Sequence, residues 1–237
     1  MRLGAIVVLA MSAGIAGGQN VSFSFASDTA SEQPTFRGSA GDGHMHLGRV
    51  RTDLLVDDAN GPLPTLEYDT LFYHDFELTT IGATLLPSGQ FLHMYSINGS
   101  FRFRGSTVMN VTVLDGVFTS LGDEDSWGTT ATIQGSSLAG STVTYQWMTD
   151  DQPAYNLFNG DSTSDMTDFA FTLTNLQSFP DVGVVTPGVI LNPQTGLPGL
   201  AWQSEGSFSG SAFFVPTSGA VSVLGIAGAG LYRRKRL

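Results

Sequence analysis

Two clusters of carboxylates lie close enough together along the chain to bind a cation. One is the run 122–125 (GDED), and the other is the stretch 159–168 (NGDSTSDMTD). Ca²⁺ takes about six to eight oxygen ligands, which clustered loop carboxylates supply. The second stretch departs from the EF-hand pattern, because Met166 and Thr172 stand where that loop has Gly and Glu. The alternative is a pair of solvated turns rich in Asp, Ser and Gly. The candidate calcium ligands are Asp123, Asp125, Asp161, Asp165 and Asp168.

Two aromatic residues beside these clusters are candidates for sugar binding. Trp127 follows the first cluster and Tyr155 precedes the second. Rings with an apolar body and a polar edge suit surfaces that are partly wet. We therefore expect both side chains to be exposed and to offer a carbohydrate platform. Tyr145 and Trp147 alternate with polar residues in a strand-like run, which favours core packing for them.

His44 and His46 form a His-x-His pair. On a strand, both imidazoles point to one face, an arrangement that can start a transition-metal site. The alternative is a pair of ordinary surface histidines without a ligand.

A secreted glycan hydrolase is an alternative from another functional class. Its site would need two carboxyl groups about 5–9 Å apart. Glu205, close to Trp202, is one candidate acid, and Glu67 or Glu77 is the second. Nothing in the spacing links these residues, and the chain has no Cys for thiol catalysis, disulfides or Cys-type metal sites. We therefore expect a protein without enzymatic activity, with no catalytic residue and no cofactor other than calcium.

The charge is distributed unevenly along the chain. Five of the ten basic residues lie at the two ends, while all 21 acidic residues lie between Asp28 and Glu205. The central part therefore has five Arg, no Lys and a net charge of −16. Such a surface repels phosphate backbones, which require neutralising Lys and Arg, so nucleic-acid binding is disfavoured. Cations, and polymers bridged by cations, are the partners that this field favours.

Both ends of the chain have the pattern of export signals. Arg2 precedes the apolar run Leu3–Ala16, and small residues lead to a cleavage site between Gly18 and Gln19, as in a secretory signal. At the other end, the uncharged, mostly apolar or small stretch Thr217–Tyr232 is shorter than the roughly 20 residues of an ordinary membrane span. The basic cluster that follows is expected to stay in the cytoplasm, and its residues are Arg233, Arg234, Lys235 and Arg236.

Val215-Pro216, a short Gly- and Ala-rich hydrophobic segment and a terminal Arg cluster follow one another in this order. This tail of about 22 residues resembles the PEP-CTERM sorting signal, although Thr217-Ser218 replace the usual Glu-Pro. The resemblance implies processing by a membrane exosortase-like enzyme, transient or permanent anchoring at the membrane, and display at the cell surface, often with extracellular polysaccharide. The alternative is a plain C-terminal membrane anchor.

Alternation of apolar and polar residues with period two predicts strands through most of the chain between the two ends. In Leu66–Thr79 most apolar residues share one face, and Leu71 and Tyr73 interrupt the other. The acidic residues on that other face are Glu67, Asp69, Asp75 and Glu77. We expect this acidic face to be solvated and partly paired with Arg102 and Arg104 on a neighbouring strand. The alternative is a surface that binds cations or polysaccharide. Asn98-Gly99 separates two alternating runs and therefore predicts a two-residue hairpin turn.

About ten short strands with turn signals between them favour an all-β fold, namely an antiparallel sandwich or jelly roll. We expect a signal helix in residues 1–18, one β domain in residues 19–214 and a hydrophobic helix in residues 215–237. The sequence thus predicts an exported, surface-displayed or matrix-associated β protein without enzymatic activity. A calcium-assisted carbohydrate-binding module and a secreted glycan hydrolase are the alternatives.

Overall fold

The computed structural model describes residues 19–26, 34–58, 65–105, 109–147, 167–179 and 184–214, all within one compact unit, Gln19–Phe214. The expected signal and C-terminal helices fall outside these residues. So do three of the candidate calcium and carbohydrate residues, Tyr155, Asp161 and Asp165, and the residues predicted for sorting and processing apart from Gln19.

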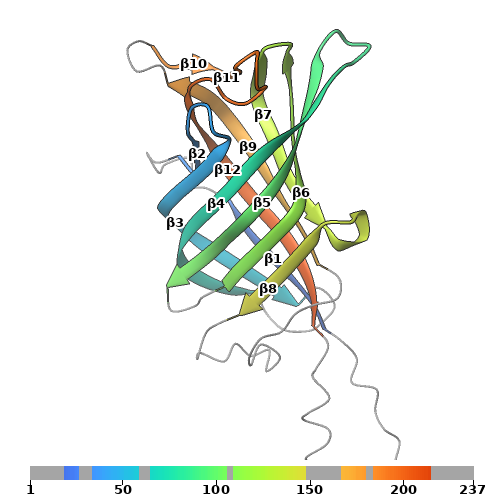
Figure 1. Cartoon of the computed structure of the whole chain (residues 1–237). Helices are drawn as coiled ribbons and strands as arrows, with labels where there is room; N and C mark the ends of the chain where they lie inside the picture. Colours follow the sequence, from blue (N-terminus) through green and yellow to red (C-terminus); the bar gives the residue numbers. More distant parts are fainter. Residues whose placement is uncertain are drawn as a thin grey trace, which may run out of the picture. The chain divides into compact units, whose positions relative to one another are not determined.

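The described part of the chain is all-β, as predicted (Figure 1). Its helical content is one short 3₁₀ turn, η1 (Ser137–Ala139). The strands are β1 (Gln19–Ala26), β2 (Phe36–Gly38), β3 (His44–Asp58), β4 (Leu66–Leu85), β5 (Phe91–Gly105), β6 (Met109–Asp123), β7 (Ser126–Ser136), β8 (Thr142–Trp147), β9 (Thr167–Phe179), β10 (Thr186–Pro187), β11 (Val189–Ile190) and β12 (Ala201–Phe214).

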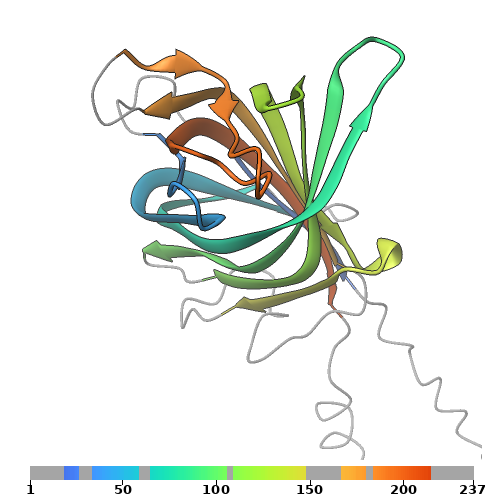
Figure 2. The same cartoon turned by 45° about the horizontal axis from the view of Figure 1, so that its top comes forward.

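The strands form one antiparallel sheet that closes on itself. Pairing runs in a cycle of eight strands, β1-β3-β4-β5-β6-β7-β9-β12 and back to β1. β2 lies between β12 and β3, and β8 continues the sheet beside β6. Figure 2 shows these strands arranged around an interior. The predicted sandwich is not confirmed, because the strands form one sheet and not two.

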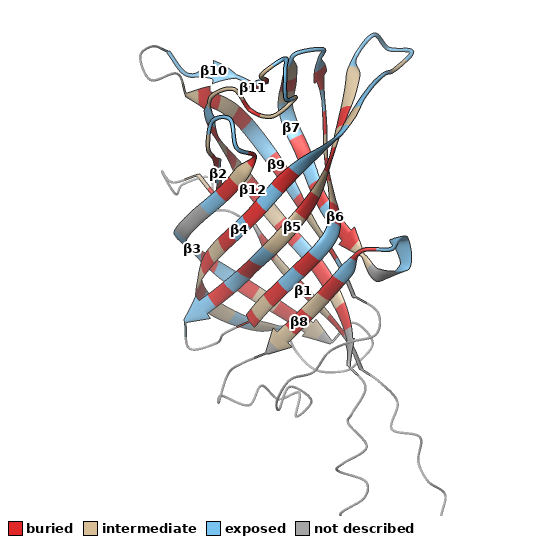
Figure 3. Ribbon diagram, in the orientation of Figure 1, coloured by how far each residue is buried: buried red, intermediate tan, exposed pale blue. Residues whose placement is uncertain are grey.

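Phenylalanine side chains fill the interior of the closed sheet. Alternate residues along each strand point inward, which gives the banded burial pattern of Figure 3. Phe171 lies among several rings, with its centroid 4.9 Å from that of Phe101 and 5.1 Å from that of Phe208. Each buried Phe contributes about 1.5–3 kcal/mol through the hydrophobic effect. The fully or almost fully buried Phe residues are Phe23, Phe25, Phe36, Phe72, Phe76, Phe101, Phe103, Phe118, Phe169, Phe171 and Phe208.

The predicted hairpin at Asn98-Gly99 is wrong, because β5 runs straight through these two residues. A β-bulge against β6 accommodates them, and the Asn98 Oδ1 accepts a hydrogen bond from the Asp115 amide at 2.9 Å. Gly99 (φ +144°) leaves no room for a Cβ, which would collide with the carbonyl oxygen of Asp75 on β4. The β4–β5 turn lies instead at residues 86–90, where the Gly89 amide donates to the Leu86 carbonyl.

Candidate functional site

The main candidate site is a groove at the end of the sheet that lies away from Gln19 and Phe214. The β4–β5 hairpin extends beyond β3 here, since β3 pairing stops at Glu77 while β4–β5 pairing continues to Leu85 (Figures 1 and 2). The β6–β7 turn and the segment 191–196 form the other walls. The groove has a volume of about 670 Å³. Its lining residues are Thr80, Gly82, Ala83, Phe91, His93, Tyr95, Asp123, Glu124, Asp125, Leu191, Asn192, Pro193, Thr195 and Gly196.

A chain of hydrogen bonds holds one wall of the groove in place. The Trp127 Nε1 donates to the Tyr95 hydroxyl at 3.0 Å, and that hydroxyl donates to the Gly196 carbonyl at 2.6 Å. Burial raises the pKa of Tyr95 to about 12, so the hydroxyl keeps its proton and remains a donor. The segment 191–196 is thereby anchored to the core.

Trp127 is a core residue, and the prediction that it forms an exposed sugar platform is wrong. Its side chain is 1% exposed, and its ring centroid lies 4.6 Å from that of Phe118 and 5.5 Å from that of Trp202. Its position directly after the acidic turn suggested exposure, but it is the second residue of β7 and points inward. Tyr95 contributes to the groove in its place.

His93 is a buried residue in the lining of the groove. The side chain is only 3% exposed, and its Nε2 lies 2.7 Å from the Asp123 carbonyl oxygen. Because a carbonyl only accepts, Nε2 carries a proton in this bond. Among the described residues, none makes a hydrogen bond to Nδ1.

The polar lining of the groove is acidic. Asp123, Glu124 and Asp125 are all exposed at the β6–β7 turn, and the Leu191 amide donates to the Asp125 carbonyl at 2.8 Å. The described lining contains no Lys or Arg. The groove therefore attracts cations, and its apolar residues, including Phe91 and Leu191, suit a ligand with an apolar surface.

The candidate calcium residues do not form one cluster. Asp168 is the second residue of β9, at the end of the sheet opposite to Asp123 and Asp125. Its Oδ1 accepts hydrogen bonds from the amide and hydroxyl of Ser211 at 2.9 and 2.7 Å. Within the ranges that the structure describes, no group of three or more His, Asp or Glu is placed to hold a metal ion. Calcium at the β6–β7 turn stays a prediction.

The His-x-His pair lies on the outer face of β3. The ring centroids of His44 and His46 are 5.4 Å apart, and the His44 Nε2 lies 2.8 Å from the Asp75 Oδ1 on β4. Both imidazoles therefore share one face, and in this arrangement His44 is bound to a carboxylate.

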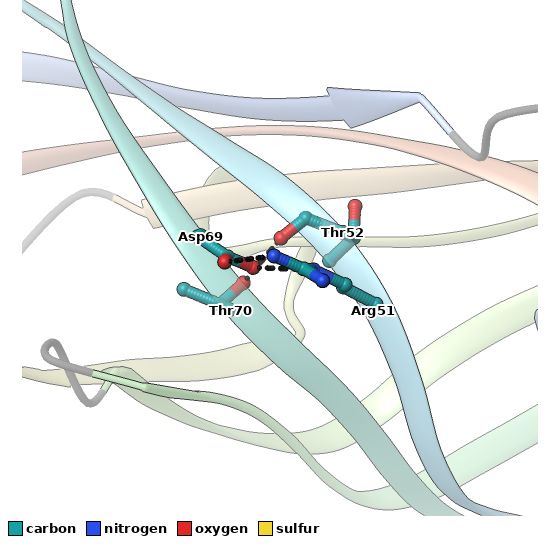
Figure 4. A network of polar contacts seen from close by, with 4 residues as sticks. All are labelled: Arg51, Thr52, Asp69 and Thr70. Atoms are coloured by element: carbon teal, nitrogen blue, oxygen red, sulfur yellow. Dashed lines mark hydrogen bonds and ion pairs between the residues drawn. The ribbon is translucent and has the colours of Figure 1, made fainter.

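The acidic face of β4 is exposed as predicted, but its pairing partner is a different arginine. Figure 4 shows Arg51 of β3 on the Asp69 carboxylate, with the Nε–Oδ1 distance at 2.9 Å. The hydrogen bonds from Arg51 hold the pKa of Asp69 below its usual value. Arg102 and Arg104 lie instead over the ring of Tyr73, at 5.0 and 5.6 Å from its centroid.

The residues considered for glycan hydrolysis lie on separate strands. Glu205 is on β12, where its Oε2 accepts a hydrogen bond from the Asn175 Nδ2 at 3.0 Å, and Trp202 is buried. Glu67 and Glu77 are exposed on β4, which is not a neighbour of β12.

Comparison of the chain with protein-family profiles, with curated proteins and with solved structures finds no match. In the part of the chain that the structure describes, no helix is long and apolar enough to cross a membrane.

Most of the groove could not be located from sequence alone. The acidic run 122–125 is visible in the sequence, but His93, Tyr95 and the segment 191–196 come from other strands and loops. The signal that pointed to the segment was the density of Pro and Gly around Pro193 and Gly196, which indicates a turn but not its place in space.

Proposed function

We propose that this chain is an exported, surface-displayed or matrix-associated β protein that acts by binding and not by catalysis. The observation that carries the proposal is the pairing of Gln19 with Phe214 at one end of the sheet. The predicted signal ends at Gly18 and the predicted sorting tail begins at Val215, so both are joined to the same end. The acidic groove lies at the other end.

This arrangement, with both chain ends at one end of the sheet and the groove at the other, suits a tethered protein. A chain held at Phe214 through its tail presents the β4–β5 hairpin and the groove away from the point of attachment. The net charge of −16 over the central part keeps such a surface soluble and disfavours nonspecific binding to polyanions. An adhesive or structural role within extracellular polysaccharide is the most direct use of this arrangement.

Export is tested in the native host with the full chain and an antibody against residues 19–214. We expect the protein in the surface or extracellular fraction, with Gln19 as its first residue. Replacing Arg233, Arg234, Lys235 and Arg236 by Gln should leave the tail unprocessed or the protein misplaced. The control replaces Arg102 and Arg104, which are exposed on β5. Recovery of the intact chain in the cytoplasm would refute the proposal.

The groove favours a second candidate function, a calcium-assisted carbohydrate-binding module. Its size, its aromatic wall at Phe91 and its carboxylates are the features such a module needs. The test incubates the protein with insoluble polysaccharides in calcium and in chelator. Retention that requires calcium and is lost in Asp123→Asn/Asp125→Asn supports this function. An unchanged melting temperature with no retention in either buffer argues against it.

A further inference from the structure

We propose that the free edge of β4 pairs with the same edge of a second copy of this chain, so that two sheets join through their β4–β5 hairpins. The inference goes beyond the proposed function, because it needs neither export nor a ligand in the groove. Three features of the hairpin point to this partner, namely its unpaired main chain, its self-complementary side chains and its lack of charge.

The edge of β4 that faces away from β5 has no strand beside it beyond Glu77 in the part of the chain that the structure describes. β3 pairs with β4 as far as Glu77, and the Leu78 amide donates to the Gly43 carbonyl at 3.0 Å. From Thr79 to Leu85, β4 pairs with β5 and with no other described strand. The hairpin therefore projects beyond its neighbours, as Figures 1 and 2 show. An exposed edge of this kind is a template for pairing with another strand.

The free edge presents the main-chain groups of Ala83 and Leu85. The Leu86 amide donates to the Gln90 carbonyl at 2.8 Å, so the polar groups of Leu86 point across the hairpin. In an antiparallel sheet, these groups alternate between the two sides of a strand. Those of Ala83 and Leu85 therefore point away from β5, and outside the sheet pairing none of the described residues makes a backbone hydrogen bond to them. Both residues thus offer an N–H and a C=O to another strand.

A two-fold axis at Thr84 makes this edge complementary to itself. In antiparallel pairing about the axis, Thr84 lies opposite Thr84 of the second copy, and Ala83 lies opposite Leu85. Ala83 and Leu85 then exchange both hydrogen bonds on each side of the axis, so that about four join the two chains. Their side chains form apolar pairs on one face, and the two Thr side chains meet on the other. All three side chains are exposed, Leu85 to 60%, and the β4 bulge between Thr80 and Gly82 lies outside the register.

The hairpin has no charge in a strongly acidic molecule. No Asp, Glu, Lys or Arg lies between Leu78 and Leu92, whereas the central part of the chain carries −16. An extended strand from Glu77, the last carboxylate of β4, to Leu85 spans about 26 Å, well beyond the screening length of about 8 Å at 0.15 M salt. Asp123, at the end of β6, is separated from the free edge by β5. Two copies can therefore meet at this edge with less repulsion than through their acidic surfaces.

Self-association is measured by sedimentation equilibrium of the full-length protein. Pairing over a few residues buries less than a standard interface, so we expect a weak dimer with a Kd on the order of 0.1 mM, within a concentration series of about 0.01 to 1 mM. Repulsion between the acidic bodies opposes this dimer. The Kd should therefore fall about threefold or more when NaCl is raised from about 0.02 to 0.5 M.

A charged variant and its matched control locate the contact. Thr84→Asp places two carboxylates opposite each other on the two-fold axis and should weaken the dimer about fivefold or more. Thr129→Asp adds the same charge at an exposed position of β7 and should leave the Kd within about twofold of the parent. Because both positions are exposed, the melting temperatures of both variants should stay close to that of the parent.

A cysteine on the axis tests the register. The chain has no Cys, so an introduced thiol can pair only with its copy. The two Thr84 residues form a pair of the non-hydrogen-bonded kind, with Cα atoms about 4.5 Å apart, which a disulfide can span. Thr84→Cys should therefore give a covalent dimer under mild oxidation. Thr129→Cys, also at an exposed position, should remain mostly monomeric.

Three results would overturn the inference. A parent that stays monomeric at about 1 mM in high salt would leave the edge to a strand of another protein. Equal dimerisation of the parent and Thr84→Asp would place the contact elsewhere on the chain. A dimer that Thr84→Cys traps no better than Thr129→Cys would exclude the register centred on Thr84. None of these results bears on export, which the fractionation experiment tests separately.

Discussion

His74 is a histidine in the interior, packed among phenylalanines. It is 4% exposed, its ring stacks on that of Phe36 with centroids 4.6 Å apart, and neither ring nitrogen makes a hydrogen bond within the described residues. Burial, opposed in part by backbone groups of Met45 and Thr35, lowers the pKa of His74 from 6.5 to about 3. The folded protein therefore holds this side chain neutral.

This burial predicts acid sensitivity of the fold. As pH falls from 6.5 toward 3, the unfolded chain takes up a proton at this position and the folded chain does not, so stability is complete above 6.5 and is lost below it. By about pH 4.5 the loss is roughly 3 kcal/mol. In urea unfolding at pH 7 and pH 4.5, His74→Leu should show a smaller fall in the free energy of unfolding than the parent.

The control for this comparison is His46→Gln, because His46 is exposed on β3 and its charge affects the pKa of His74 less than burial does. Carboxylates such as Asp69, whose pKa is lowered by Arg51, also lose stabilisation in acid. Their contribution is the same in the parent and both variants and cancels. If His74→Leu and the parent lose equal stability between the two pH values, the role assigned to His74 is wrong.

The Tyr95 hydroxyl is predicted to stabilise the wall of the groove. Tyr95→Phe leaves the Trp127 Nε1 without its acceptor and the Gly196 carbonyl without its donor. Leaving a buried group unpaired costs about 1–3 kcal/mol, which urea unfolding measures directly. Tyr73→Phe removes the same atom from a partly exposed ring on the outer face and should change stability by less than about 0.5 kcal/mol. Similar losses in both variants would contradict the assignment.

Strands in which apolar and polar residues alternate without interruption could be predicted from the sequence. Leu66–Thr79 corresponds to the first two thirds of β4, with Phe72 and Phe76 inside and Asp75 outside. β3 was not predicted, because a bulge between Gly48 and Val50 shifts its inward positions from odd to even numbers. Arg49 has a positive φ of 86° at this bulge. A period-two pattern that changes phase is not visible as one strand.

Gly99 shows how tertiary pairing overrides a turn signal, and it predicts a difference between two similar glycines. Gly99 and Gly82 both lie at bulges with positive φ, +144° and +156°, but an added Cβ would strike the Asp75 carbonyl only at Gly99 and would meet nothing within 4 Å at Gly82. Gly82→Ala should cost about 1 kcal/mol through its backbone alone. Gly99→Ala should cost about 1–3 kcal/mol more through the clash, as measured by urea unfolding. Equal costs would show that β4 moves away without penalty.

For the molecule as a whole, the all-β class followed from the sequence but closure of the sheet did not. Closure depends on the pairing of β1 with β12, at opposite ends of the described chain, and on the pairing of β9 with β12, which are not consecutive strands. Periodicity shows which face of a strand is buried but not which strand lies beside it. The same limit applies to the groove, since three separate parts of the chain meet there. The acidic run 122–125 is visible in the sequence, but the sequence does not show which other residues lie beside it in the groove.

The charge of the whole molecule predicts a dependence of stability on salt. Only two ion pairs, His44–Asp75 and Arg51–Asp69, join described residues, so most of the described carboxylates have no cationic partner among these residues. The central part of the chain carries a net charge of −16. The mutual repulsion of the carboxylates is larger in the compact state than in the unfolded chain. Raising NaCl from about 0.01 to 0.15 M shortens the screening length from about 30 to 8 Å, so the melting temperature should rise. Melting temperatures in MgCl₂ and CaCl₂ at the same ionic strength distinguish charge screening from binding of a particular cation. A melting temperature that is flat across the NaCl series would show that self-repulsion is not a significant term, and an additional rise in CaCl₂ alone would indicate a calcium site.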